Sequence, residues 1–71
     1  MEKVAAHVTG TVAKVEKRAG DRVSAGEVVV ILESMKMEML VESPVGGTVR
    51  EVRCSEGQSV AEGDILVLIE I

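Results

Sequence analysis

Apolar residues recur along this chain in short runs, with no helical spacing. The longest runs cover residues 28–32 and 65–69. Both are too short for a helix, are rich in branched aliphatic residues and are bounded by turn residues. The segments 10–15 and 47–52 each open with Gly-Thr-Val and continue into further valine, which favours strands. The pattern therefore predicts an all-β chain.

The sequence contains an internal repeat, in which the same pattern occurs twice. Residues 10–33 read GTVAKVEKRAGDRVSAGEVVVILE, and residues 47–70 read GTVREVRCSEGQSVAEGDILVLIE. The offset is 37 without a gap, and nine of the 24 aligned positions are identical. Neither copy can bury its apolar face alone. We therefore expect the two copies to pack face to face about a pseudo-twofold axis, as a flattened β-barrel or sandwich of two antiparallel sheets.

Glycines at matched positions divide each copy in the same way. Positive φ costs glycine less than any other residue, so each of these glycines predicts a tight turn. They are Gly20 and Gly26 in the first copy, and Gly57 and Gly63 in the second. We expect a very short strand between the two turns of each copy, at Val23 and at Val60.

The segment between the copies, residues 34–46, begins within the stretch ESMKMEM at 33–39. The position equivalent to Lys36 lies before residue 1, so a pseudo-twofold axis places Lys36 at the opposite end from the chain termini. A two-residue hairpin turn at Met35 and Lys36 would give both residues positive φ. It would also place facing residues across the hairpin, Ser34 opposite Met37 and Glu33 opposite Glu38.

Composition narrows the possible functions. The chain has 71 residues, so we expect one domain over 1–71 with a small aliphatic core, because no aromatic residue is present. The formal net charge of −4 argues against nucleic-acid binding. No apolar run is long enough to span a membrane, and no signal peptide is recognisable. One cysteine fits a reducing compartment, so we expect a cytoplasmic protein without a metal site.

Lys36 is the candidate functional residue, and its surroundings indicate which chemistry it can take part in. A lysine that acts as a nucleophile needs a dry pocket, which an exposed hairpin tip does not provide. We expect Lys36 to be an acceptor that another enzyme modifies, and we assign no catalytic residue. Met35 and Met37 would serve as adaptable contact surface. The alternative is that these methionines fold back onto the core and Lys36 is a solvated turn residue.

The chain resembles the biotinyl domain of biotin carboxyl carrier proteins, in the biotinyl/lipoyl attachment family. The resemblance covers essentially the whole chain. It rests on ESMKM at 33–37, close to the family's E-A-M-K-M, and on the repeated framework GTV…GDRV…GE and GTV…GQSV…GD. It implies a barrel-sandwich hybrid of two four-stranded sheets, of a small stand-alone type without a thumb, or a domain cut from a larger carboxylase.

The resemblance also implies a function that composition does not reveal. Lys36 would receive biotin in amide linkage from a biotin protein ligase that reads Glu33, Met35 and Met37. The biotinylated lysine would then shuttle a carboxyl group between a biotin carboxylase and a carboxyltransferase. The protein itself would be a carrier rather than an enzyme, and we expect a monomer.

Some positions depart from the family pattern. Ser34 replaces the usual alanine, and His7 stands where a proline is common, whereas Pro44 keeps that place in the second copy. Lipoyl domains carry an acidic residue directly before the lysine, where Met35 stands here, but lipoate on Lys36 stays open. An unmodified, hammerhead-like protein-interaction module is the remaining alternative.

Four further side chains are interpreted as structural or incidental. Cys54 aligns with Lys17 of the first copy, so we expect it to be exposed and incidental. His7 has no acidic or cysteine motif around it and is read as structural. Arg50 and Arg53 are expected to be solvated or paired surface charges, worth little each.

Overall fold

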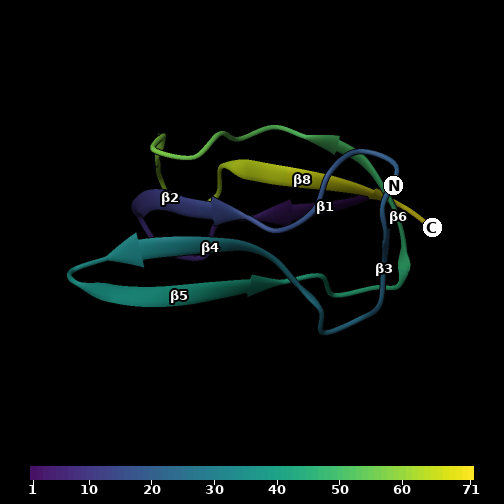
Figure 1. The fold of residues 1–71 in the computed structure, drawn as a ribbon, viewed down its shortest axis with the longest axis horizontal. Coiled ribbons are helices and arrows are strands. Elements are labelled where there is room, and N and C mark those ends of the chain that lie inside the picture. The colour runs from purple at the N-terminus through teal and green to yellow at the C-terminus, as the bar shows by residue number, and fades with distance from the viewer.

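The computed structural model describes residues 1–71, which form eight strands and no helix (Figure 1). The strands follow one another along the chain as β1 Glu2–Ala5, β2 Gly10–Val15, β3 Arg22–Val23, β4 Val28–Ser34, β5 Met37–Glu42, β6 Gly47–Val52, β7 Ser59–Val60 and β8 Ile65–Glu70. The predicted strands, including the two very short ones, are therefore confirmed. No helix long and apolar enough to cross a membrane is present.

The strands form two four-stranded antiparallel sheets, with the orders β1-β8-β6-β3 and β5-β4-β2-β7. A shift of 37 residues converts each strand of one sheet into the corresponding strand of the other. The strand pairings repeat with the same shift: Thr11 lies opposite Glu33 in the β2–β4 pair, and Thr48 lies opposite Glu70 in the β6–β8 pair. The expected fold class, a flattened barrel-sandwich with pseudo-twofold symmetry, is confirmed.

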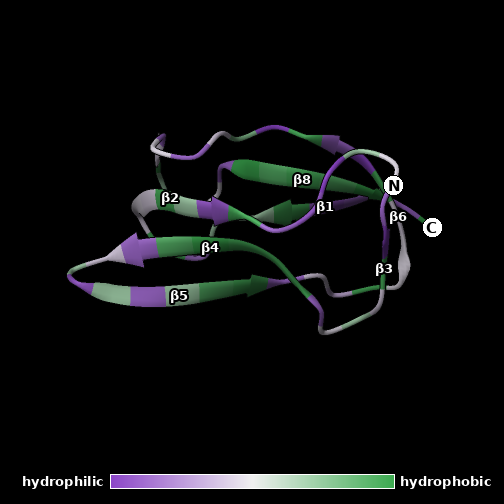
Figure 2. Cartoon of the chain, viewed as in Figure 1, coloured by the Kyte–Doolittle hydropathy of each residue, from purple (hydrophilic) through white to green (hydrophobic).

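The core lies between the sheets and is made of aliphatic side chains. Fourteen buried hydrophobic residues form one cluster, with Leu32, Leu66 and Ile69 among the largest. Figure 2 shows the same division along the ribbon, with hydrophobic stretches in β4 and β8 and hydrophilic loops around them. Ser43 is the one buried polar residue, and its hydroxyl donates a hydrogen bond to the Val45 carbonyl at 2.6 Å.

Glycines serve two different purposes in this frame. All four turn glycines have positive φ, between 87° and 97°, as the sequence predicted. Gly10 has another role, because a Cβ there would lie 2.6 Å from the Glu33 carbonyl oxygen. Gly47 approaches the Glu70 carbonyl in the same way. The glycine of each Gly-Thr-Val therefore lets the first strand of a copy approach the end of the last.

The molecule is elongated, with extents of 32 × 19 × 18 Å. The β4–β5 hairpin projects at one end of the long axis, and both termini lie at the other end (Figure 1). The hairpin is therefore placed as the repeat predicted, as far from the termini as the domain allows.

Candidate functional site

The turn between β4 and β5 consists of two residues, Met35 and Lys36. Their φ angles are 50° and 64°, the left-handed backbone that a type I′ turn requires at both central positions. They are the two residues other than glycine with positive φ in the chain. Backbone of this kind is uncommon for residues with a Cβ and costs free energy. The structure thus places two unfavourable residues at the point where Asn-Gly would be expected.

The strands below the turn hold it in a fixed register. Ser34 lies opposite Met37, and Glu33 lies opposite Glu38, so the predicted hairpin pairing is confirmed. β4 is itself an inner strand of its sheet, paired with β2 on its other side. The turn is therefore carried on a supported strand rather than on a loop.

The side chains around the turn face solvent. Met35 is 92% exposed and Met37 is 62% exposed, so neither folds back onto the core as the alternative interpretation required. Glu33 and Lys36 are exposed as well. Lys36 takes part in none of the three ion pairs of the structure. The structure thus brings together all four residues singled out from the sequence and leaves the Lys36 amine accessible.

Cys54 lies deeper in the protein than the sequence predicted. Cys54 is 8% exposed, so the prediction of an exposed thiol is wrong, and burial raises its pKa. The error came from its alignment with Lys17, which keeps its amine at the surface by extending to Glu27. The shorter Cys54 side chain packs against the core cluster instead. His7 is exposed, and Arg50 pairs with Glu70 at 3.2 Å.

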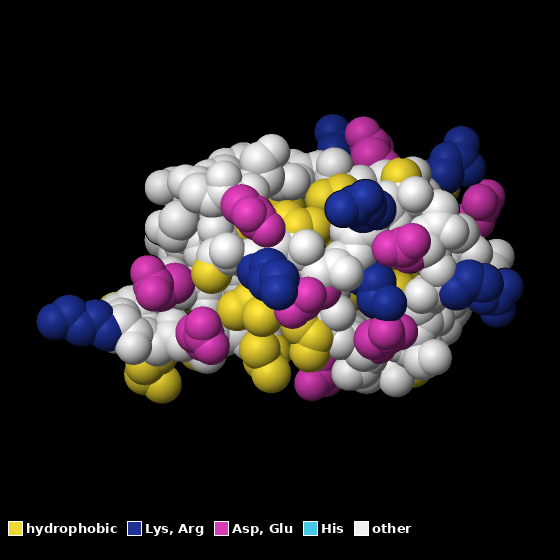
Figure 3. Space-filling view, viewed as in Figure 1, with side chains coloured by type: hydrophobic (Ala, Val, Ile, Leu, Met, Phe, Trp, Pro, Cys, Tyr) yellow, Lys and Arg dark blue, Asp and Glu magenta, His cyan; other side chains and the backbone are white.

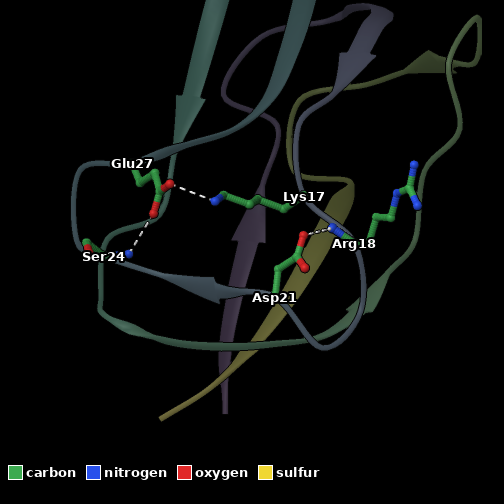
Figure 4. A network of polar contacts seen from close by, with 5 residues as sticks. All are labelled: Lys17, Arg18, Asp21, Ser24 and Glu27. Atoms are coloured by element: carbon green, nitrogen blue, oxygen red, sulfur yellow. Dashed lines mark hydrogen bonds and ion pairs between the residues drawn. The ribbon is translucent and has the colours of Figure 1, made fainter.

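Sequence reasoning missed the ion pair between Lys17 and Glu27, whose Nζ and Oε2 atoms lie 2.6 Å apart (Figure 4). Glu27 also accepts a hydrogen bond from the Ser24 backbone N–H at 2.9 Å. Lys17 lowers the pKa of Glu27 through this side-chain hydrogen bond, with the Ser24 bond adding to it, and the same hydrogen bond raises the pKa of Lys17. The pair links two loops of the first copy and has no counterpart in the second.

A shallow hollow of about 500 Å³ lies between the loops that follow β2 and β6. Equivalent residues of the two copies line it in pairs, including Val15 with Val52 and Lys17 with Cys54. No residue of the β4–β5 hairpin contributes to it. No cluster of three or more His, Cys, Asp or Glu side chains is arranged to hold a metal ion. The hairpin tip therefore remains the candidate site.

A β domain that presents one lysine on a strained, exposed hairpin turn is built like an attachment domain. Comparison with known families agrees: the family model described as "biotin-requiring enzyme", the biotin/lipoyl attachment domain, matches residues 2–69. The chain belongs to this family. The resemblance inferred from the ESMKM stretch and the repeated glycine framework is thereby confirmed.

The similar proteins and solved structures include both carboxylases and a lipoyl domain. The mitochondrial alpha subunit of methylcrotonoyl-CoA carboxylase from Rattus norvegicus is 46% identical over 39 residues, 55% of this chain and 6% of that protein. The urea carboxylase of Kluyveromyces lactis superposes with a TM-score of 0.92 at 35% identity, over 97% of this chain and 6% of that one. The lipoyl domain of the 2-oxoglutarate dehydrogenase complex from Azotobacter vinelandii gives 0.76 at 26% identity, over 96% of both chains.

These matches define the extent of the similarity. The chain spans 6% of the length of the rat carboxylase subunit and of the yeast urea carboxylase. It spans almost all of the lipoyl domain. Both kinds of relative support a small domain of the biotin/lipoyl attachment family.

The residues present fit a covalently attached acyl cofactor. The requirement is an amine that a modifying enzyme can enclose, and Lys36 lies at an exposed tip outside every ion pair. The turn also holds the start of the side chain in place, because two residues leave the backbone little freedom. What the geometry provides is therefore an exposed primary amine on a two-residue turn.

Proposed function

We propose that this chain is a biotin carboxyl carrier, in which a biotin protein ligase attaches biotin to Lys36. The biotinylated domain would carry a carboxyl group between a biotin carboxylase and a carboxyltransferase. The observation that carries this proposal is the turn itself. Lys36 has a φ of 64° and stands between two exposed methionines, at the opposite end from the termini.

Lys36 would contribute the amine to which biotin is joined and a flexible side chain that lets the attached group move between sites. Its Nζ would form an amide with the biotin carboxyl group, with overall loss of one water. When bound, biotin supplies the ring nitrogen that takes up and releases the carboxyl group. The rigid hairpin keeps the attachment point at the end of the domain, so the tethered group reaches each partner site at a high effective concentration.

Met35 and Met37 are assigned to recognition by the ligase. An exposed methionine has little to gain in an isolated domain, and thioether side chains adapt readily to a partner surface. Glu33, three residues before the lysine, is assigned to the same contact. Because the turn residues are held at fixed φ, the ligase would meet the two methionines and the lysine in one arrangement.

A lipoyl carrier is the second candidate. The similarity to the Azotobacter vinelandii lipoyl domain over 96% of both chains favours it. In that case the same lysine would carry lipoate for acyl or aminomethyl transfer. We prefer biotin because Met35 stands where lipoyl domains carry an acidic residue, and because the carboxylase relatives share more sequence with this chain.

The assignment of the lysine is tested by Lys36→Arg, with Lys3→Arg and Lys14→Arg as matched controls. Each protein is expressed with a biotin protein ligase and probed with streptavidin. Only Lys36→Arg should lose the signal, and its melting temperature should stay near the parent's because an exposed tip charge adds little stability. A streptavidin signal that survives Lys36→Arg would overturn the assignment.

A further inference from the structure

The outer face of the β4–β5 hairpin carries an exposed apolar pair. Leu40 is 51% exposed and lies opposite Ile31 across the two strands. Ile31 is half-buried and does not belong to the core cluster. Apart from the end residues Met1 and Ile71, every strongly exposed large hydrophobic residue lies on this hairpin. Figure 3 shows hydrophobic side chains gathered over β4 and β5, with acidic side chains on either side of them.

Three carboxylates border this apolar pair. Strand alternation puts Glu33 on the same face of β4 as Ile31, and Glu38 and Glu42 on the same face of β5 as Leu40. None of the three takes part in an ion pair. We call Ile31, Leu40 and these three glutamates the hairpin patch.

The internal repeat allows this surface to be compared with the equivalent surface of the other sheet, where β1 pairs with β8 in the same register as β5 with β4. There, Lys3 stands at the position of Leu40. Glu70 stands at the position of Glu33 and is paired with Arg50 at 3.2 Å, whereas Ala13 occupies the arginine's place beside Glu33. The equivalents of Glu38 and Glu42 are Met1 and Ala5. The apolar Ile31 has an apolar equivalent in Leu68, so the two surfaces differ at Leu40, which Lys3 replaces, and in their carboxylates. Those of the hairpin patch are unpaired, whereas Glu70 is paired with Arg50.

Lys14 is the basic residue nearest to the patch along the sheet, and lies opposite Ile31 on the other side. Its amine lies 3.9 Å from a Glu16 carboxylate oxygen, so its charge is already shared with another carboxylate. The hairpin patch keeps an uncompensated negative charge directly behind the turn that presents Lys36.

A second copy of this chain does not suit the surface. β5 is an edge strand of its sheet, and an antiparallel pairing of two β5 strands centred on Leu40 would bring Glu38 of each copy against Glu42 of the other. Like charges opposite each other across strands are destabilising. A partner with cations at these positions would instead gain from the pairing.

We infer that the hairpin patch docks the enzyme that works on the arm at Lys36, through a partner surface that is apolar at its centre and bordered by Lys or Arg. This inference rests on the proposed function, in which a biotin carboxylase is such an enzyme. The patch begins at the Glu33–Glu38 pair just below the turn, so a protein seated on it has the Lys36 side chain at its border. Docking there supplies affinity from fixed side chains and leaves the arm free.

The test uses the biotinylated protein and the biotin carboxylase of the same host, with the carrier as varied substrate. Leu40→Lys replaces the central leucine of the patch with lysine, the residue at the equivalent position (Lys3) of the other sheet. Lys3→Leu makes the reverse change on the other sheet and serves as the control. Intact mass first confirms complete biotinylation of both variants, and thermal melts confirm folding. We expect KM for the carrier to rise roughly tenfold in Leu40→Lys, the effect of losing a central interface contact, with kcat unchanged and no change in Lys3→Leu.

The charge component has its own variant, Glu38→Gln/Glu42→Gln. It should raise KM at low salt and weaken the dependence of KM on ionic strength. Unchanged KM in fully biotinylated Leu40→Lys, or equal increases in Leu40→Lys and Lys3→Leu, would overturn the docking surface while the proposed function stands. A dimer of the parent in sedimentation that Leu40→Lys abolishes would overturn it in favour of a second copy. A parent that the ligase leaves unmodified would overturn both.

Discussion

Met35 and Lys36 form the whole connection between β4 and β5, and both have positive φ in the structure. Neither residue suits that backbone, since asparagine and glycine are the residues that two-residue hairpins favour there. A chain selected for stability alone would place Asn-Gly at the turn. We interpret the unfavourable pair as the cost of presenting a lysine outward between two methionines.

The double substitution Met35→Asn/Lys36→Gly measures this cost. It should raise the free energy of unfolding by about 1 kcal/mol or more, because each strained residue costs on the order of 1 kcal/mol, and it removes the acceptor. Urea denaturation of the unmodified proteins gives the comparison. The single variant Met35→Asn should show part of the gain while keeping Lys36. A double variant clearly less stable than the parent would contradict this account of the turn.

Recognition by the ligase is tested at the methionines. Met35→Asp and Met37→Ala should slow biotinylation strongly and change the melting temperature little, because both side chains are mostly exposed. Met39→Ala is the matched control, because Met39 is partly buried against the core. It should lower the melting temperature by removing packed atoms and affect the biotinylation rate less. The reverse ranking would mean that the tip methionines act through stability.

Cys54 should react slowly with a thiol reagent such as Ellman's reagent in the native protein. Its side chain is buried, and burial raises its pKa, so both access and thiolate fraction are reduced. Adding urea through the unfolding transition should raise the rate steeply. Equal rates in native and unfolded protein would contradict the burial of the thiol.

The repeat explains why so much of the fold could be predicted from the sequence. One offset of 37 relates the strands, turns and register of the two halves, so positions such as Val23 and Val60 support each other's assignment. The same offset failed at Cys54, because equivalent backbone positions carry side chains of different length. The need for Gly10 was also missed: it comes from the Glu33 carbonyl approaching within 2.6 Å of where a Cβ would lie, a distance that only tertiary packing creates.

The hairpin tip was predicted more completely than the rest of the surface. Loop length alone fixed the facing pairs of the hairpin, Ser34 with Met37 and Glu33 with Glu38. The Lys17–Glu27 pair was not predictable in this way, because it joins two loops whose approach depends on how the sheets pack. The absence of an ion pair at Glu33 was also not predicted. Ala13 stands where the other sheet has Arg50, which pairs with Glu70, and the effect of this difference shows only when the two sheets are compared.

The Lys17–Glu27 ion pair predicts a pH dependence of stability. The pKa of Glu27 is lowered in the folded protein, so its contribution is present above its unfolded pKa and is lost as pH falls through the folded value. The pKa of Lys17 is raised, so its contribution is present below its unfolded pKa and is lost as pH rises through the folded value.

Glu27→Gln should therefore lose stability relative to the parent near neutral pH, and the difference should shrink at both acidic and alkaline pH. Asp64→Asn is the control in the second copy, where Cys54 replaces the lysine. Its carboxylate accepts a hydrogen bond from the Ala61 backbone N–H at 2.8 Å but forms no ion pair. The alkaline part of the effect should be missing in Asp64→Asn. A difference between parent and Glu27→Gln that stays constant across pH would contradict the ion pair.

Biotin attachment at Lys36 is tested most directly by the intact mass of this protein purified from its native host, followed by peptide mapping. We expect a mass increase of one biotin less one water, located on the peptide that contains Lys36 and on no other lysine. A mass increase of one lipoate less one water on Lys36 would establish the lipoyl carrier instead. An unmodified chain, or biotin on a different lysine, would contradict the claim that the strained turn exists to present Lys36.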